Sequence, residues 1–172
     1  MRRLGAIGLA LAMALGLGGC VAAGRLAREE AAAPVFDPAR FFAGETRGEG
    51  VLSVAFSGAR PVRVASRGVT AADGSIVLDQ TVREGDRPAR QRQWRLRPAG
   101  SGRWTGTLSD ASGPVAGEVA GNRLHLRFRM TGGLDAEQWL YLRPGGREVL
   151  NRMVVRKLGV PVASLTETIR KP

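Results

Sequence analysis

The strongest constraint on the fold is a two-residue alternation of apolar and polar side chains in short segments. It is clearest over residues 122–131, where Leu124, Leu126, Phe128 and Met130 alternate with Arg123, His125, Arg127 and Arg129. Such alternation is typical of a β-strand with one buried and one solvated face. The segment 92–97 repeats it, with Trp94 and Leu96 on the buried face.

Further strands are expected at about 51–57, 61–70, 76–82, 103–109, 114–120, 137–143, 147–157 and 160–170. Glycine-containing turn signals separate them, such as Asp73-Gly74, Gly132-Gly133 and Gly145-Gly146. Many short strands at this spacing predict a β-sandwich or a β-barrel. No long amphipathic helix follows Phe42, so an α/β fold is disfavoured.

Between those two architectures, the turns favour an antiparallel up-and-down barrel of about eight to ten strands. Short glycine turns pair each strand with the next, and closure removes exposed edges. A Greek-key sandwich would need long crossovers. Arginine at alternate strand positions disfavours a transmembrane barrel, whose outer face must be apolar. The interior would be filled by side chains or hold one small ligand.

A short helix is expected just before the strands. Asp37 can cap it, Pro38 suits the first helical position, and Phe41 and Phe42 would plug it onto the core.

The N-terminus has the pattern of an export signal. Met1-Arg2-Arg3 precedes an uncharged apolar run over residues 4–17, which is shorter than the roughly 20 residues that span a bilayer. The run ends in Leu17-Gly18-Gly19-Cys20, which resembles a bacterial lipobox and implies lipidation of Cys20. The alternative is an ordinary secretory signal followed by an unrelated cysteine. We expect a signal peptide at 1–19, a lipidated Cys20 with a flexible tether at 20–36, and a barrel domain at 37–172.

Location and partners follow from that N-terminus. Several acyl chains on Cys20 would anchor the protein stably in a membrane. Val21, where an aspartate would favour retention, resembles lipoproteins sent to the outer membrane, so we expect a monomer there that faces the periplasm. The formal net charge is +11, but an exported chain has no nucleic-acid partner. The charge instead favours orientation against an anionic membrane.

One cysteine and one histidine in the whole chain restrict its chemistry. They exclude an internal disulfide, a Cys/His zinc cluster and a Cys–His nucleophilic pair. His125 alternates in phase with arginines, so we place it on the solvated face of its strand. We therefore expect no cofactor and no metal.

Several motifs in order resemble a family of uncharacterised bacterial lipoproteins with a lipocalin-like barrel, the domain of unknown function 3833. They are Phe41-Phe42-Ala43-Gly44 with Gly48 and Gly50, Arg92-Gln93-Trp94-Arg95-Leu96, Trp104 to Asp110, Gly113, Gly117 and Gly121-Asn122, Trp139-Leu140-Tyr141, Asn151-Arg152, and Lys157 to Val160 with Thr166. The resemblance covers about residues 41–171. The family tends to carry two acids before the late tryptophan, where this chain has Glu137-Gln138. The resemblance implies a fold and a location but no chemistry.

The candidate binding residues are large inward side chains and two cations. Trp94, Trp104, Phe128, Trp139 and Tyr141 would line a cavity in a hollow barrel, or form the core of a filled one. Arg92 and Arg152 are the expected buried or mouth-lining cations, able to hold a carboxylate or phosphate in a bidentate grip. Alternatively, each is a structural arginine paired with an acid such as Asp110 or Glu118.

Acidic residues give a weaker indication of catalysis. Asp110 is either a catalytic carboxylate or a turn residue whose side chain caps nearby backbone N–H groups. Glu118 and Glu137 are candidates to flank the barrel mouth, but nothing in the sequence sets their separation. No catalytic residue is therefore assigned.

Three functions remain open. The first is a non-enzymatic, lipid-anchored domain that binds an apolar or amphiphilic small molecule inside the barrel. The second is an envelope interaction module whose arginine-rich surface binds anionic lipopolysaccharide or a partner protein. The third is an enzyme that modifies lipid precursors through Asp110 or Glu137.

Overall fold

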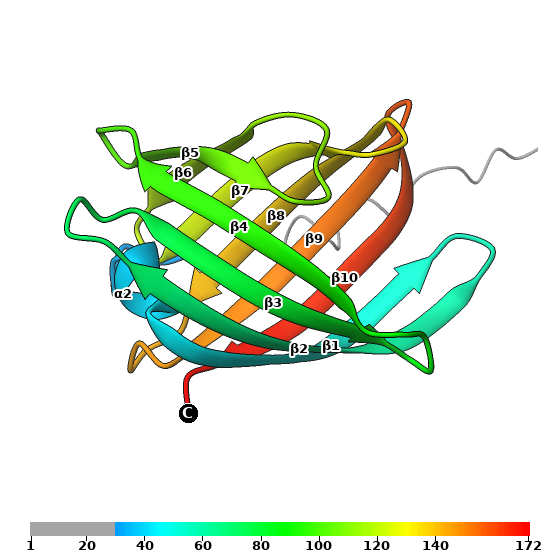
Figure 1. The fold of residues 1–172 in the computed structure, drawn as a ribbon, viewed down its shortest axis with the longest axis horizontal. Coiled ribbons are helices and arrows are strands. Elements are labelled where there is room, and N and C mark those ends of the chain that lie inside the picture. The colour runs from blue at the N-terminus through cyan, green and yellow to red at the C-terminus, as the bar shows by residue number, and fades with distance from the viewer. Residues whose placement is uncertain (1–29) are drawn as a thin grey trace, which may run out of the picture.

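Ten antiparallel strands and one short helix make up the fold in the computed structural model, which describes residues 30–172 (Figure 1). The expected signal peptide, Cys20 and most of the tether lie outside the described residues. The elements are α2 (Pro38–Phe42), β1 (Gly44–Val54), β2 (Gly58–Thr70), β3 (Ile76–Glu84), β4 (Arg90–Pro98), β5 (Arg103–Leu108), β6 (Val115–Ala120), β7 (Arg123–Met130), β8 (Leu134–Leu142), β9 (Glu148–Lys157) and β10 (Val160–Arg170).

The strands close into a barrel in which each strand pairs with its neighbour in sequence. β1 completes the ring by pairing with β10, with Gly50 opposite Glu167. The predicted up-and-down, lipocalin-like barrel is therefore confirmed. Among residues 30–172, no helix is long and apolar enough to cross a membrane.

Burial follows the alternation seen in the sequence. Along β7, Leu124, Leu126 and Phe128 are buried while Arg127 and Arg129 are exposed. Successive side chains of a strand point to opposite faces, so the buried set faces the barrel interior.

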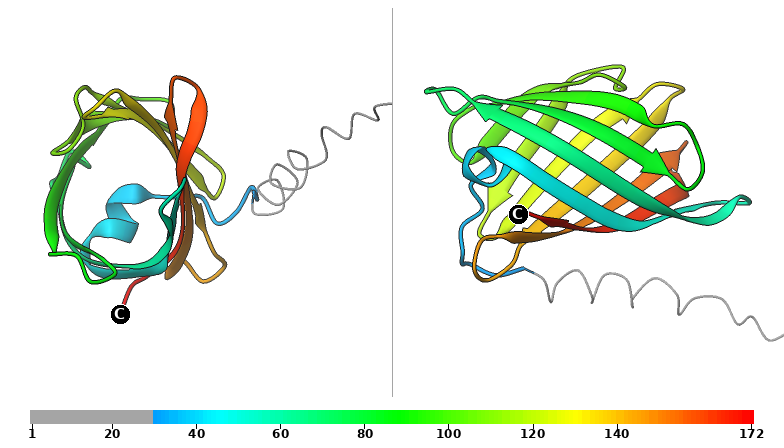
Figure 2. Two further views of the ribbon diagram at one scale, coloured as in Figure 1. Left: turned by 90° about the vertical axis from the view of Figure 1, so that its right-hand side faces the viewer. Right: turned by 60° about the horizontal axis from the view of Figure 1, so that its bottom comes forward.

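Helix α2 lies across one end of the barrel (Figure 2). Asp37 caps it, since its Oδ1 accepts a hydrogen bond from the backbone N–H of Arg40 at 3.1 Å. Phe41 and Phe42 are buried, with ring centroids 5.0 Å apart, as predicted. A Cβ on Gly68 would lie 1.9 Å from the carbonyl oxygen of Phe42, so glycine in β2 allows this close approach. In the described chain, no helix or strand covers the opposite end (Figure 2).

Residues 30–36, here called the N-terminal segment, lie against the turn between β6 and β7. The N–H of Ala31 donates to Asn122 Oδ1 at 2.7 Å, and the N–H of Phe36 donates to the carbonyl oxygen of Gly121 at 2.8 Å. Phe36 belongs to the core. The folded part therefore begins before the expected boundary at residue 37. A chain starting at Val21 contains every described strand and the whole described core.

Candidate functional site

The barrel encloses a cavity of about 240 Å³. It extends from Phe42, on the helix that covers one end, to Glu84 and Arg90 near the opposite end. The wall is mostly aliphatic, including Leu52, Val62, Val64, Leu78, Leu126, Leu140, Met153, Val155, Leu165 and Ile169. An apolar hollow with a few polar groups is the usual form of a small-molecule site.

Arg92 is the main cation of the wall. Its Nε lies 3.3 Å from Asp110 Oδ1, and its guanidinium carbon lies 5.4 Å from the centroid of the Trp94 ring. Burial lowers the pKa of Arg92, and the charge of Asp110 partly offsets this. The structure therefore satisfies both expectations for Arg92, since it lines the cavity and is paired with an acid.

Glu167 on β10 is the buried acid of the wall, with 4% of its surface exposed. Its Oε2 accepts a hydrogen bond from Asn151 Nδ2 at 2.8 Å. Burial raises the pKa of Glu167, while the Asn151 hydrogen bond and the charge of Arg92 oppose the rise. A buried carboxyl with a raised pKa is a frequent mark of a functional site.

Gln80 on β3 connects other polar groups of the interior. The indole N–H of Trp94 donates to Gln80 Oε1 at 2.8 Å, and Gln80 Nε2 donates to Ser66 Oγ at 3.0 Å. By contrast, Glu167 Oε1, Asn151 Oδ1 and Thr46 Oγ1 are buried without a hydrogen-bond partner in the described structure. Buried polar atoms are normally hydrogen-bonded, so those of Glu167 and Asn151, which line the cavity, can accept contacts from a bound molecule.

The structure brings part of the predicted binding set together. Trp94 and Arg92 line the cavity, and Arg92 lies over the Trp94 ring. Phe128 packs edge to face on Trp94, with centroids 5.3 Å apart, but belongs to the core and does not line the cavity. Trp104 packs against the core but does not line the cavity.

The inward placement of Trp139, Tyr141 and Arg152 is wrong. On β8, Gln138 and Leu140 line the cavity, so Trp139 and Tyr141 lie on the other face of the strand. Tyr141 is nevertheless buried there, with 1% of its surface exposed. On β9, Asn151 and Met153 line the cavity, which turns Arg152 outward. Arg152 donates instead to Thr166 Oγ1 at 3.2 Å.

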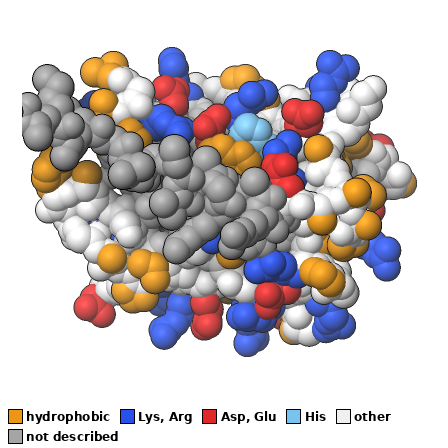
Figure 3. All heavy atoms as spheres, turned by 180° about the vertical axis from the view of Figure 1, so that it is seen from behind, with side chains coloured by type: hydrophobic (Ala, Val, Ile, Leu, Met, Phe, Trp, Pro, Cys, Tyr) orange, Lys and Arg blue, Asp and Glu red, His pale blue; other side chains and the backbone are white. Residues whose placement is uncertain are grey.

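The outer face of β7 and β8 carries a small aromatic cluster. The ring of His125 stacks on Trp139, with centroids 5.0 Å apart and planes 7° from parallel. Burial and the charges of Arg127 and Arg123 lower the pKa of His125, against the opposing charge of Glu137. Figure 3 shows the histidine on the outer surface among charged side chains. Within residues 30–172 no group of acids, histidines and cysteines could hold a metal ion.

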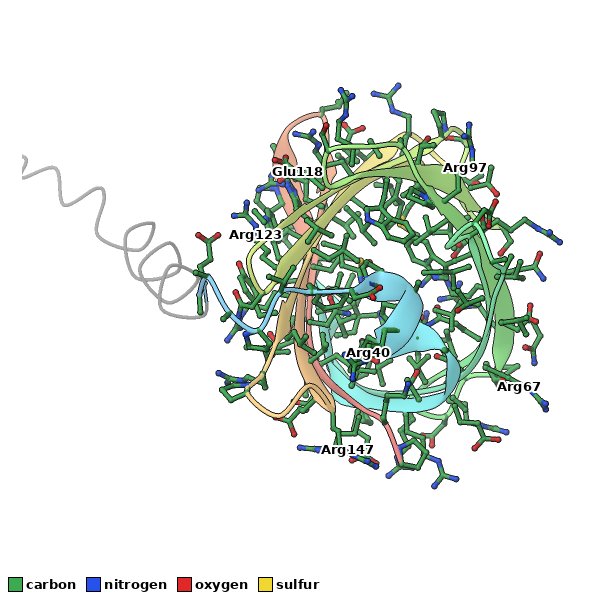
Figure 4. The ribbon with its side chains drawn as sticks, turned by 90° about the vertical axis from the view of Figure 1, so that its left-hand side faces the viewer. Arg40, Arg67, Arg97, Glu118, Arg123 and Arg147 are labelled. Atoms are coloured by element: carbon green, nitrogen blue, oxygen red, sulfur yellow. The ribbon has the colours of Figure 1, made fainter. Side chains whose placement is uncertain are left out.

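The acidic residues lie elsewhere than expected. The carboxylate of Asp110 faces Arg92 and Arg90 and accepts no backbone hydrogen bond in the described structure, so the turn-capping interpretation is wrong. Glu118 and Glu137 lie on the outer face and not at the mouth. Glu137 is next to Gln138, which lines the cavity, so its side chain points the other way. Glu118 lies opposite His125, which alternates with the cavity-lining Leu124 and Leu126. On the outer face Glu137 pairs with Arg156 at 2.9 Å. Figure 4 shows Glu118 outside the ribbon.

Sequence reasoning gave no role to Glu167, Asn151 or Gln80. A signal was present at Gly48 and Gly50, which alternate on the inward face of the neighbouring β1. Two small residues on one inward face leave room for a large polar side chain on the next strand. The sequence alone does not show that β1 pairs with β10, so it does not show which side chain fills that room.

Comparison with known proteins assigns the chain to a family. The chain belongs to a family described as protein of unknown function (DUF3833), whose model matches residues 14–171. No curated protein matches the chain.

Solved structures that share the fold include a lyase and a protein of unknown function. An S-type phycobiliprotein lyase from Guillardia theta is 9% identical, with a TM-score of 0.63 over 78% of this chain and 90% of that one. A protein of unknown function from the DUF3598 family of Nostoc punctiforme is 12% identical, with a TM-score of 0.58 over 81% of this chain and 50% of that one. At these identities the likeness shows the barrel fold alone.

Proposed function

We propose that this protein binds a small amphiphilic molecule inside its barrel. The observation that carries the proposal is the apolar cavity whose wall holds buried polar atoms without partners, at Glu167 and Asn151. An apolar tail would lie among the aliphatic side chains, since burial of apolar surface is favourable. Its polar end would lie at these atoms and at Arg92.

The size of the cavity limits the ligand. At about 240 Å³ it is slightly smaller than the roughly 300–1,000 Å³ common for drug-sized ligands. A small amphiphile fits inside. A longer lipid-like molecule would be held by one end, with the rest emerging from the end that α2 does not cover.

The site of action is proposed from the N-terminal pattern. Lipidation at Cys20 would fix the protein to a membrane of the cell envelope, with the outer membrane favoured by Val21. The ligand would then be a lipid or lipid-derived compound of the envelope. Likeness to a phycobiliprotein lyase, which has the same fold, is compatible with an interior ligand.

Native mass spectrometry of the purified chain tests the proposal by identifying what it retains. Binding of an environment-sensitive apolar dye, and its displacement by fatty acids and lysophospholipids, gives an affinity. We expect Ala163→Phe, which projects into the cavity, to abolish dye binding while the barrel stays folded. Ala65→Phe on the outward face of β2 is the matched control. A wild-type barrel that retains no ligand and takes up no dye contradicts the proposal.

Salt dependence separates this function from binding by surface arginines. Several outer arginines are already paired, including Arg129 with Asp135 and Arg170 with Glu148. Surface binding through the others would weaken strongly with added salt, because salt screens exposed charges. Binding of the tail in the cavity would not.

A further inference from the structure

Two hairpin tips at the uncovered end of the barrel present large apolar side chains to solvent. Phe56 lies in the turn between β1 and β2 and is 110% exposed, and Leu158 lies in the turn between β9 and β10 and is 91% exposed. Val160, next to the second tip, is also exposed. Neither tip contributes to the core, so the stability of the fold does not explain these side chains.

The backbone at both tips makes the choice of residue more unusual. Phe56 has a φ of 63° in a turn closed by a hydrogen bond from Ser57 N–H to the carbonyl oxygen of Val54. Leu158 and Gly159 have φ values of 50° and 81°, the combination of a type I′ turn, which favours Asn-Gly. Bulky residues at positive φ are strained, and such strain gathers at functional positions.

The two tips belong to adjacent parts of the barrel. β1 pairs with β10, and beyond that ladder the N–H of Ala55 donates to the carbonyl oxygen of Val162 at 2.9 Å. Both turns lie at the end away from α2 (Figure 1). The same end holds Glu84 and Arg90 of the cavity wall, so the tips flank the entrance to the cavity.

Basic side chains lie at this end of the barrel, one beside a tip and two further along the strands. Lys157 adjoins Leu158, and Arg63 and Arg83 face each other across β2 and β3 on the outer face. All three are exposed and make no ion pair in the described structure. Of the acids at this end, Glu84 is paired with Arg90 and Arg87, and Asp86 is exposed next to Arg87 in the turn between β3 and β4. Apolar tips within a basic rim match an anionic bilayer, with apolar acyl chains beneath negative headgroups.

We propose that the uncovered end of the barrel docks onto an anionic lipid bilayer, with Phe56 and Leu158 inserted among the acyl chains and the basic rim on the headgroups. This surface lies outside the cavity, so the docking proposal can be right or wrong independently of the proposed function. Docking would place the cavity entrance at the membrane surface, where an amphiphile can pass between bilayer and barrel.

Flotation with vesicles tests the proposal on the chain from Val21 to Pro172, which lacks the site of the expected anchor and contains the whole described fold. We expect binding to phosphatidylcholine vesicles that contain anionic phosphatidylglycerol, and weaker binding to phosphatidylcholine alone. Phe56→Ser and Leu158→Asn should each weaken binding about tenfold, since each removes a large inserted apolar side chain.

Two features separate docking from a general effect on the fold. Leu158→Asn should keep or raise the melting temperature while it weakens vesicle binding, because asparagine suits the positive φ of this turn. Val69→Ser is the matched control: Val69 is 67% exposed but lies near α2, where Thr70 Oγ1 donates to the carbonyl oxygen of Ala39. It should leave binding unchanged.

Three results would overturn the proposal. Vesicle binding that is the same in Phe56→Ser and Leu158→Asn as in wild type would show that the tips do not insert. An equal loss in Val69→Ser would show that general surface hydrophobicity is responsible. A wild-type chain that binds neither vesicle would assign the tips to a protein partner instead.

Discussion

Gly48 on β1 leaves the space that the carboxylate of Glu167 on β10 occupies. A Cβ atom on Gly48 would stand 1.9 Å from Glu167 Oε1, and one on Gly50 would stand 2.8 Å from the Cβ of Glu167. The two glycines therefore make room for a buried acid in a mostly apolar wall.

Gly48→Ala should lower the free energy of unfolding by about 1–3 kcal/mol, because overpacking displaces the buried carboxyl. Urea unfolding measures it. In a Glu167→Ala background the same change should be much less destabilising, since the space is then free. Equal losses in both backgrounds would contradict the steric relationship.

The raised pKa of Glu167 gives a pH dependence of stability with a definite sign. The folded state keeps this proton at a pH where the unfolded chain, with an ordinary pKa near 4.5, has lost it. The stabilisation is present below about pH 4.5 and is lost as the pH rises through the folded-state pKa. Urea unfolding across this range should therefore show wild type losing stability relative to Glu167→Gln as the pH rises. Parallel profiles would show that the burial of Glu167 does not perturb its titration.

The pairing of Arg92 with Asp110 should appear as a coupling energy. Arg92→Ala leaves the Asp110 carboxylate near Arg90 alone and should lower the free energy of unfolding by about 3 kcal/mol. Asp110→Ala should also destabilise. The double variant should lose less than the sum of the two, because neither charge is then left unpaired. Additive losses in a denaturant series would argue that the 3.3 Å contact contributes little.

His125 offers a clean titration, since it is the one histidine of the chain. Because burial and Arg127 lower its pKa, its imidazole NMR signal should titrate with a midpoint below 6.5. Arg127→Gln should raise that midpoint. Arg67→Gln, across the barrel on β2, should leave it unchanged (Figure 4). A midpoint at or above 6.5 would contradict the packed environment on Trp139.

Asn122 should control the docking of the N-terminal segment. Its side chain accepts from Ala31 N–H and donates to the carbonyl oxygen of Leu142 at 3.1 Å. Asn122→Ala should make the segment cleavable by a protease before α2, with a loss of about 1–2 kcal/mol in global stability. Mass spectrometry of the limited digest locates the cut. Asn151→Ala, on β9 in the cavity wall, should not expose this site; if it does, general loosening explains both.

Much of the fold could be predicted because local patterns determine it. All ten expected strands are present, and the Asp37-capped helix buries Phe41 and Phe42 as predicted. Alternation, turn glycines and helix caps act between residues close in the chain, so a single sequence displays them directly.

The set of inward-facing side chains was predictable only in part. Trp94 and Phe128 alternate with arginines, which fixes their side of the strand. Residues 138–142, Gln-Trp-Leu-Tyr-Leu, are apolar on both faces, so size suggested that Trp139 and Tyr141 point inward. They point outward because β8 shares its register with β7, where Leu124 and Leu126 face the interior.

The sequence by itself determined the strands, their turns and the order in which neighbours pair. The tertiary structure decided which polar groups meet. Glu167 belongs inside only because closure of the barrel sets β10 beside Gly48 and Gly50, more than a hundred residues earlier in the chain. Which side chains share a wall depends on register between distant strands, and register is fixed by packing across the whole barrel rather than by any local pattern.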